Sequence, residues 1–359
     1  MSTYKTPYQK KPPDQYDNCP VFLANYLAYL SNNENQRPAT VIECYVNIRD
    51  FCQYIQALRS LPAPPDSKEY KKIDVSNLAL HWLTITNQDE VYDYIDLLQN
   101  ICGNAETTIS KKVLLLRKFF QYLDDNKTEL NVRFPYGNPF RDIQTAKPPQ
   151  SIAHVLPMAQ VQKLLNCTTG TTAVRDKAMI HILVTTGLTL LELVRLNWGD
   201  LDQNVKLLTI RRDDSFRSVA LTDGCLESIL KYKRDLCTSI DRDDTDAPYE
   251  ITEKSPMFQA EGTHRRLNPR SVSLRITKTA TTAGLHDPRN PINANSLRDT
   301  AVAIALQQYS AAERPYVLSA FGFRNHASAA RFANVPSAHG TNADLLFKGL
   351  SNSPLSELK

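Results

Sequence analysis

The stretch Thr186-Gly187-Leu188-Thr189-Leu190-Leu191-Glu192-Leu193 lies near the middle of the chain, and the apolar pattern changes around it. A helix is predicted before the glycine, over residues 176–184, and another after it, over residues 190–196. The period then shortens to that of strands over residues 206–210 and 217–221, and the polar turn between them makes a candidate hairpin. This part of the chain is therefore expected to combine helices with one small antiparallel sheet.

The rest of the chain has mostly helical periodicity. Further helices are predicted over residues 21–30, 38–58, 87–98, 109–123, 158–165, 271–283 and 296–308. In the helix over 109–123, a spacing of 100° per residue turns Lys111 and Lys118 away from the apolar stripe. Residues 256–259 are a candidate third strand. The fold class predicted is mainly α (α+β).

Composition and length narrow the class of protein. The 359 residues, 42% hydrophobic and 22% charged, suffice for two domains, each with a core. Proline (21) outnumbers glycine (11), which favours helical architectures over Gly-lined nucleotide folds. The longest apolar run, residues 178–184, is too short to span a membrane, and the polar N-terminus lacks the apolar core of a secretion signal. A cytoplasmic protein is expected.

The cysteines give no sign of a metal site. There are seven, an odd number, with no Cys-x-x-Cys pair and no nearby histidine at zinc spacing. They are interpreted as reduced thiols of a cytosolic protein. No metal and no cofactor are expected.

Residues 139–150 have the composition of a linker. They contain Pro139, Pro148 and Pro149 together with an Asn-Pro step, which favours an extended connection between two separately packed domains. The predicted organisation is a flexible tail over 1–13, a helical domain over 14–138, the linker, a second domain over 151–340 and a C-terminal tail over 341–359.

Basic residues concentrate in one segment of the second domain. Residues 1–150 balance, with 17 Lys and Arg against 17 Asp and Glu, so the net charge of +4 comes from the remainder. Residues 262–298 contain seven basic side chains and a single acid, Asp287. Such a segment can neutralise phosphates, although a solvated surface gives the same pattern.

Several strings, taken in order from about residue 14 to 335, resemble the tyrosine recombinases, or phage integrases, of the Xer type. The quoted stretch resembles the family's Thr-Gly-Leu-Arg-x-x-Glu-Leu, and 217–221 resembles the strand after its catalytic lysine. Asn295-Ser296-Leu297-Arg298 is similar to His-x-Leu-Arg, and Phe321-Gly322-Phe323 to Leu-Gly-His. The resemblance implies an N-terminal four-helix, SAM-like core-binding domain and a recombinase-type domain with a small antiparallel sheet.

The resemblance also implies a chemistry for which most groups are missing. In the family a tyrosine attacks the scissile phosphate, two arginines neutralise it, a lysine protonates the leaving oxygen and histidines relay protons. Only Arg298 retains its family residue type. The other five positions carry Thr189, Arg212, Asn295, Phe323 and Phe332. Tyr309 and Tyr316 lie upstream, at the wrong spacing from Gly322 to replace the nucleophile.

DNA binding depends on other surfaces, so it can survive the loss of catalysis. The family clamps double-stranded DNA between its two domains, which makes basic residues on both the candidate contacts. These are Lys111, Lys112, Arg117, Lys118, Arg212, Arg265, Arg266, Arg270, Arg275, Lys278 and Arg298. For Arg298 the alternative is a buried ion pair beside Asp299. The apolar piece 343–350 is expected to dock into a second copy on DNA or to cap its own domain.

The sequence therefore predicts a nucleoid-associated, DNA-binding pseudoenzyme of this family. It would act as a transcriptional regulator or repressor of a mobile element, or as a silent subunit. Two alternatives stay open. One is an active recombinase, catalysing DNA integration, with shifted catalytic residues. The other is a protein-interaction scaffold that has lost DNA binding as well.

Overall fold

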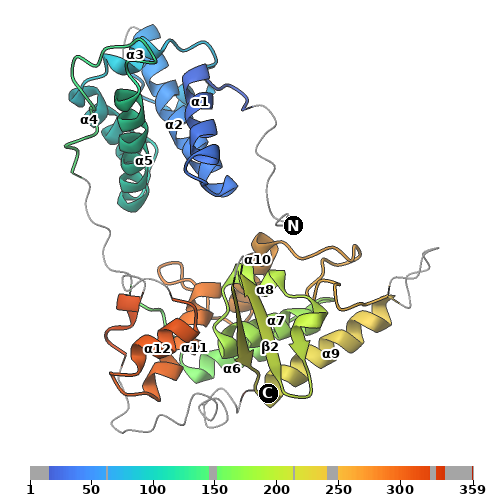
Figure 1. Cartoon of the computed structure of the whole chain (residues 1–359). Coiled ribbons are helices and arrows are strands. Elements are labelled where there is room, and N and C mark those ends of the chain that lie inside the picture. The colour runs from blue at the N-terminus through green and yellow to red at the C-terminus, as the bar shows by residue number, and fades with distance from the viewer. Residues whose placement is uncertain are drawn as a thin grey trace. The chain divides into compact units, whose positions relative to one another are not determined.

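The chain divides into two compact units, Met1–Pro149 and Gln150–Lys359. Its structure, a computed structural model (Figure 1), describes residues 16–61, 64–144, 152–212, 215–240, 250–323, 329–335 and 358. The tail expected over 1–13, the linker residues 145–150 and the apolar piece 343–350 lie outside these residues. Each unit is described by itself below.

The first unit is helical. Its elements are α1 (Val21–Asn32), α2 (Pro38–Ser60), η1 (Lys68–Lys72), α3 (Leu80–Thr84), α4 (Gln88–Asp96), η2 (Leu97–Ile101) and α5 (Glu106–Asp125). The four predicted helices are present, and the short α3 was not predicted. Asn87 caps α4 through a reciprocal pair of hydrogen bonds with Glu90, which explains why the sequence signals this start.

The core of the first unit lies between α1, α2 and α5, which pack against one another. The predicted stripe of α5 is buried, and it includes Ile109, Val113 and Leu116. Phe51 of α2 lies with its ring edge toward Phe120 of α5, at 5.9 Å between centroids. Aromatic packing of this kind gives the unit its own core.

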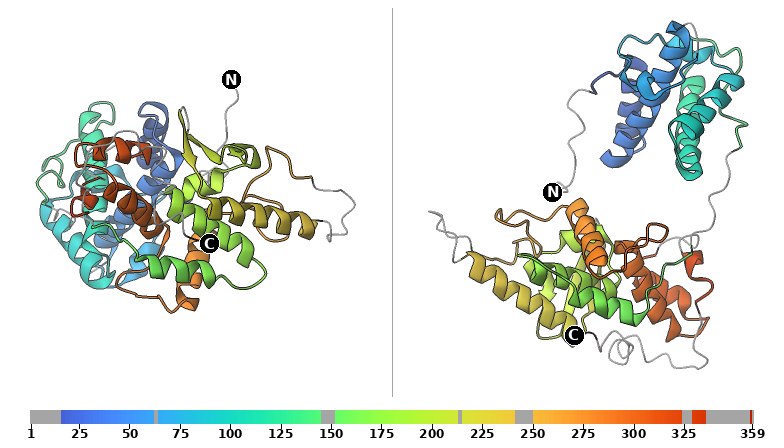
Figure 2. Two further views of the ribbon diagram at one scale, coloured as in Figure 1. Left: turned by 90° about the horizontal axis from the view of Figure 1, so that it is seen from below. Right: turned by 180° about the vertical axis from the view of Figure 1, so that it is seen from behind.

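The second unit surrounds one central helix. Its elements are α6 (Met158–Asn166), α7 (Ala173–Thr186), α8 (Leu190–Arg195), η3 (Trp198–Asp200), β1 (Leu201–Asp202), β2 (Leu207–Arg212), β3 (Ser215–Ala220), α9 (Asp223–Ile240), α10 (Pro269–Thr282), α11 (Ala294–Gln307), α12 (Arg314–Ala320) and η4 (Ala330–Phe332). Helix α7 packs against α6, α8, α9, α10 and α11 (Figure 2). The apolar run 178–184 is thus a core helix. No helix among the described residues is long and apolar enough to span a membrane.

The predicted hairpin is confirmed, but the predicted third strand is wrong. The sheet is antiparallel in the order β1-β2-β3, so its third strand is Leu201–Asp202. Residues 256–259 instead form isolated bridges from Pro256 to Asn197 and from Gln259 to Arg266. Met257 and Phe258 are fully buried. A short apolar run in a core segment has the same pattern as a buried strand, which explains the error.

Candidate functional site

The turn between α7 and α8 is shaped by a glycine and a threonine cap. Gly187 ends α7 with φ of 61°, and a Cβ there would come within 2.6 Å of the Phe321 ring. Thr189 caps α8: its hydroxyl oxygen accepts from the Glu192 amide at 3.3 Å. The Glu192 carboxylate in turn accepts from the Thr189 amide at 2.7 Å and hydroxyl at 2.8 Å. Thr189 therefore holds the helix start and places Glu192.

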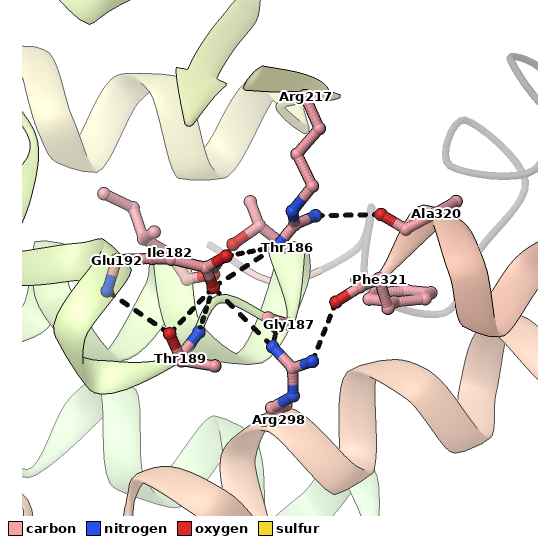
Figure 3. A network of polar contacts seen from close by, with 9 residues as sticks. All are labelled: Ile182, Thr186, Gly187, Thr189, Glu192, Arg217, Arg298, Ala320 and Phe321. Carbon is pink, nitrogen blue, oxygen red and sulfur yellow. Dashed lines mark hydrogen bonds and ion pairs between the residues drawn. The ribbon is translucent and has the colours of Figure 1, made fainter. Parts of the chain in front are cut away.

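Arg298 of α11 is turned into the protein. Its guanidinium donates to the carbonyl oxygens of Gly187, at 2.5 Å, and Phe321, at 2.7 Å (Figure 3). Nη1 lies 3.8 Å from the Glu192 carboxylate, and the side chain is 9% exposed. The guanidinium carbon also lies 4.6 Å from the centre of the Phe323 ring. These contacts tie Arg298 to the turn after α7 and to the end of α12.

A second arginine approaches the same carboxylate. Arg217 of β3 places Nη2 3.4 Å from both Glu192 oxygens, and its Nη1 donates to the Ala320 carbonyl at 3.0 Å. The Glu192 side chain is 5% exposed. The buried carboxylate thus lies between two guanidinium groups from β3 and α11 (Figure 3). We call Thr189, Glu192, Arg217 and Arg298 the Glu192 network.

The alternative predicted for Arg298 is a buried ion pair beside Asp299, and the structure places Glu192 3.8 Å from its guanidinium, whereas Asp299 has further partners. Asp299 accepts from the amide of His154 at 3.0 Å and from the guanidinium of Arg331. Burial raises the pKa of the Asp299 carboxyl above its ordinary value, and Arg331 opposes that shift. These bonds attach η4 and residues 153–154 to α11.

The family positions Phe323 and Phe332 belong to a hydrophobic cluster. Phe332 is 2% exposed, and its ring lies edge-on to Phe323 at 5.7 Å between centroids. Tyr309 is buried in the same cluster, whereas Tyr316 is 71% exposed on α12. The position at which the resemblance places the nucleophile is therefore apolar in this structure, and Phe332 has no oxygen that could attack phosphorus.

The remaining family positions lie at element ends. Asn295 is exposed in the first turn of α11. Its backbone N–H donates to the side-chain oxygen of Asn293 at 2.8 Å. Arg212 is the last residue of β2, and its side chain lies outside the described part of the structure.

Two of the four basic candidates on α5 have structural partners. Lys111 and Lys118 are exposed, so their predicted outward direction is confirmed. The DNA contact predicted for Lys112 needs correction. Lys112 is 8% exposed and donates to the Asp50 carboxylate at 2.7 Å, and the Tyr94 hydroxyl donates to the same carboxylate. These contacts keep the pKa of Asp50 below its ordinary value despite burial, which raises it.

The DNA contact predicted for Arg117 also needs correction. It donates to the carbonyl oxygens of Phe140 at 2.8 Å and Ile143 at 2.6 Å, and so anchors the segment after α5. At 100° per residue, Lys112 and Arg117 lie on the two flanks of the apolar stripe, about 60° and 80° from Ile109. Helical spacing therefore brings both to the edge of the core, and their partners distant in sequence fix the inward direction.

The basic candidates of the second unit also divide into exposed residues and residues with partners inside the protein. Arg265, Arg270 and Lys278 are exposed. Arg266 is corrected, because it donates inward to the carbonyl oxygens of Val194 and Leu196 at 2.7 and 2.9 Å. Arg275 is partly buried, with Nε 3.7 Å from the Asp176 carboxylate. The described structure therefore brings three of these candidates to the solvent.

Sequence reasoning missed the roles of Glu192 and Arg217. The spacing of Thr189 and Glu192 is that of a capping box, which is a readable signal. No local signal marks Arg217 as the partner of Glu192, because the two are brought together by the packing of the β2–β3 hairpin against α8 through β2. Among the described residues, no group of three or more His, Cys, Asp or Glu is arranged to hold a metal ion.

Comparison with known proteins identifies the family. Residues 154–339, more than half of the chain, match the phage integrase family, and the chain belongs to it. The tyrosine recombinase XerC of Caldanaerobacter subterraneus subsp. tengcongensis is 24% identical over 288 residues, covering 79% of this chain and 75% of that protein. The tyrosine recombinase XerD of Listeria innocua is 34% identical over 123 residues, covering 33% of this chain and 39% of that protein.

Solved structures share the fold. The XerH site-specific recombinase bound to a difH substrate matches with a TM-score of 0.60 and 14% identity, covering 87% of this chain and 82% of that one. A lambda integrase dimer bound to a COC′ core site matches with a TM-score of 0.57 and 13% identity, covering 90% and 79%. The predicted tyrosine recombinase fold is thus confirmed.

Proposed function

We propose that this chain is a duplex-DNA-binding member of the phage integrase family that does not cleave DNA. The observation that carries the proposal is that Phe332, a residue without an oxygen on its side chain, occupies the position where the resemblance places the nucleophile. The Glu192 network supports it. An internal carboxylate lies between Arg217 and Arg298, so the charge that a phosphate would bring is already supplied by the protein. Arg298 serves structure in this proposal rather than phosphate binding.

The burial of Phe332 supports the same conclusion. Transesterification needs an oxygen nucleophile and a clamp for the phosphate oxygens, and either loss slows it severely. Phe332 offers only a ring, packed against Phe323. A protein with this site would bind its DNA without breaking it, as a regulator or a silent subunit of a recombination complex. Such a protein would be found with the nucleoid.

Binding to duplex DNA rests on the exposed cations and on the relatives. Arg265, Arg270 and Lys278 reach solvent in the second unit, and Lys111 and Lys118 do so in the first. Both matched structures named above hold recombinases on DNA. Assembly of copies through the C-terminal tail is a further part of the proposal, on residues that lie, except for Leu358, outside the described structure.

An active recombinase is the second candidate function, favoured by the names of the relatives. It needs a nucleophile other than Phe332. Tyr309 is buried in the hydrophobic cluster. Tyr316 is exposed on α12, the helix whose end bonds to Arg217 and Arg298. A covalent protein–DNA adduct would distinguish the two candidates.

Salt dependence tests the proposed binding surface. Replacing Arg265, Arg270 and Lys278 together by alanine should reduce the slope of log affinity against log salt by about 2–3 units, because each lost phosphate contact accounts for about 0.9. The measurement is a titration of duplex binding at several salt concentrations. The double variant K231A/R234A removes two exposed cations from α9 and should leave the slope nearly unchanged. An unchanged slope in the triple variant would place the DNA elsewhere.

A further inference from the structure

Helix α10 presents one face to solvent and is free of acidic residues. Its sequence, Pro269–Thr282, contains three cations and no Asp or Glu. The inner face, which packs against α7 and α8, includes Val272, Ile276 and Ala280. The helix lies at the edge of the second unit in Figure 1 and, in orange, in the view from behind in Figure 2. Within the second unit, its outer face is exposed at Arg270, Leu274 and Lys278.

The middle of this outer face is apolar and its ends are cationic. Leu274 is 61% exposed, with Arg270 one turn before it and Lys278 one turn after it. The hydroxyls of Thr277 and Thr281 donate to helix carbonyl oxygens, at 3.1 and 3.0 Å, so their protons are already used. The face thus offers an aliphatic surface between two positive charges.

This pattern fits the major groove of DNA at a thymine. The C5-methyl of thymine is the apolar group that base pairs display there, and aliphatic side chains contact it. Arg270 and Lys278 are eight residues apart, about 12 Å along the helix, which is similar to the width of the groove. Their side chains can reach the phosphates on its two sides. A surface that is positive without any acid favours this polyanion over a protein partner.

We infer that Leu274 contacts thymine C5-methyl groups in the major groove and gives this protein a preference for thymine over bases without that methyl. The inference rests on the proposed DNA binding and adds a determinant of base preference to it. Arg270 and Lys278 position the helix on the backbone, and Leu274 reads the base.

The test compares two duplexes that differ only in the methyl group. Full-length protein is titrated with poly(dA-dT) and with poly(dA-dU) at one salt concentration. Burying one methyl against Leu274 is worth about a fourfold change in affinity, so the wild type should bind the thymine polymer about fourfold more tightly. L274A should bind both equally. V205A, which shortens an aliphatic side chain of similar exposure (59%) in the turn after β1, should keep the difference.

A second pair of polymers removes the influence of the A·U duplex itself. Poly(dG-5-methyl-dC) should bind more tightly than poly(dG-dC) for the wild type and not for L274A, because the same methyl lies in the major groove. Equal binding to both members of each pair by the wild type would overturn the inference while leaving DNA binding intact. A difference that survives in L274A would also overturn it. No salt-dependent binding to any polymer would instead refute the proposed function, and the inference with it.

Discussion

Replacing Arg298 by alanine is expected to lower the free energy of unfolding of the second unit by about 3–5 kcal/mol. The substitution removes one cation from the buried Glu192 carboxylate and leaves the carbonyl oxygens of Gly187 and Phe321 without their donor. Denaturant unfolding of the full chain, followed by a probe in the second unit, measures the loss.

A control substitution at another arginine distinguishes a structural role of Arg298 from a DNA contact. R265A removes an exposed guanidinium from the same unit and should change the free energy of unfolding by less than about 0.5 kcal/mol. R298A combined with E192Q should lose less than the sum of the two single changes, because the neutral amide no longer needs a buried cation. If R298A keeps its stability but loses duplex affinity, Arg298 is a phosphate ligand and the structural role is wrong.

Separating the two units is expected to reduce duplex affinity at least about a hundredfold. The family clamps DNA with both domains, and a short tether gives the second domain a millimolar effective concentration once the first has bound. Fragments 1–149 and 150–359 follow the division into compact units, each of which has a hydrophobic cluster of its own. Each fragment, and an equimolar mixture of both, is compared with the intact chain on one preferred duplex.

Folding of each fragment is checked first, by circular dichroism and cooperative unfolding. The mixture should remain as weak as the better fragment, because it lacks the tether. Should 150–359 alone bind as tightly as the intact chain, the first unit serves another partner and the clamp is not retained in this protein.

Local periodicity predicted the elements but not their long-range partners. The stripe of α5 and the outward Lys111 and Lys118 follow from 100° per residue alone. Lys112 lies on the flank of that stripe, about 20° from Leu123, so spacing alone brings it to the edge of the core. Its partner there, Asp50, is 62 positions away in the sequence. An ion pair between distant residues leaves no mark on either neighbourhood, so the DNA contact predicted for Lys112 needed correction.

At the candidate site, too, some features could be predicted from local sequence, and others depend on residues distant in sequence. The phenylalanine at the position where the resemblance places the nucleophile can be found in the sequence, because that position lies nine residues after Phe323. The use of Arg298 as a structural donor depends on Gly187 and Phe321, which lie 111 and 23 residues away. Helices α9 and α12 were not predicted, and both supply contacts that the sequence left unassigned, such as the Ala320 carbonyl bonded to Arg217.

Covalent trapping on nicked suicide duplexes tests most directly whether this protein binds DNA without cleaving it. Wild type and F332Y are incubated with duplexes carrying the preferred site, and complexes are resolved with and without denaturant. A XerC-type recombinase on its own site is the positive control. We expect complexes that denaturant dissolves for both proteins, because F332Y still has Thr189, Asn295 and Phe323 at the other family positions. An adduct that survives denaturant in the wild type, mapped to Tyr316 or to any other residue, would contradict the account.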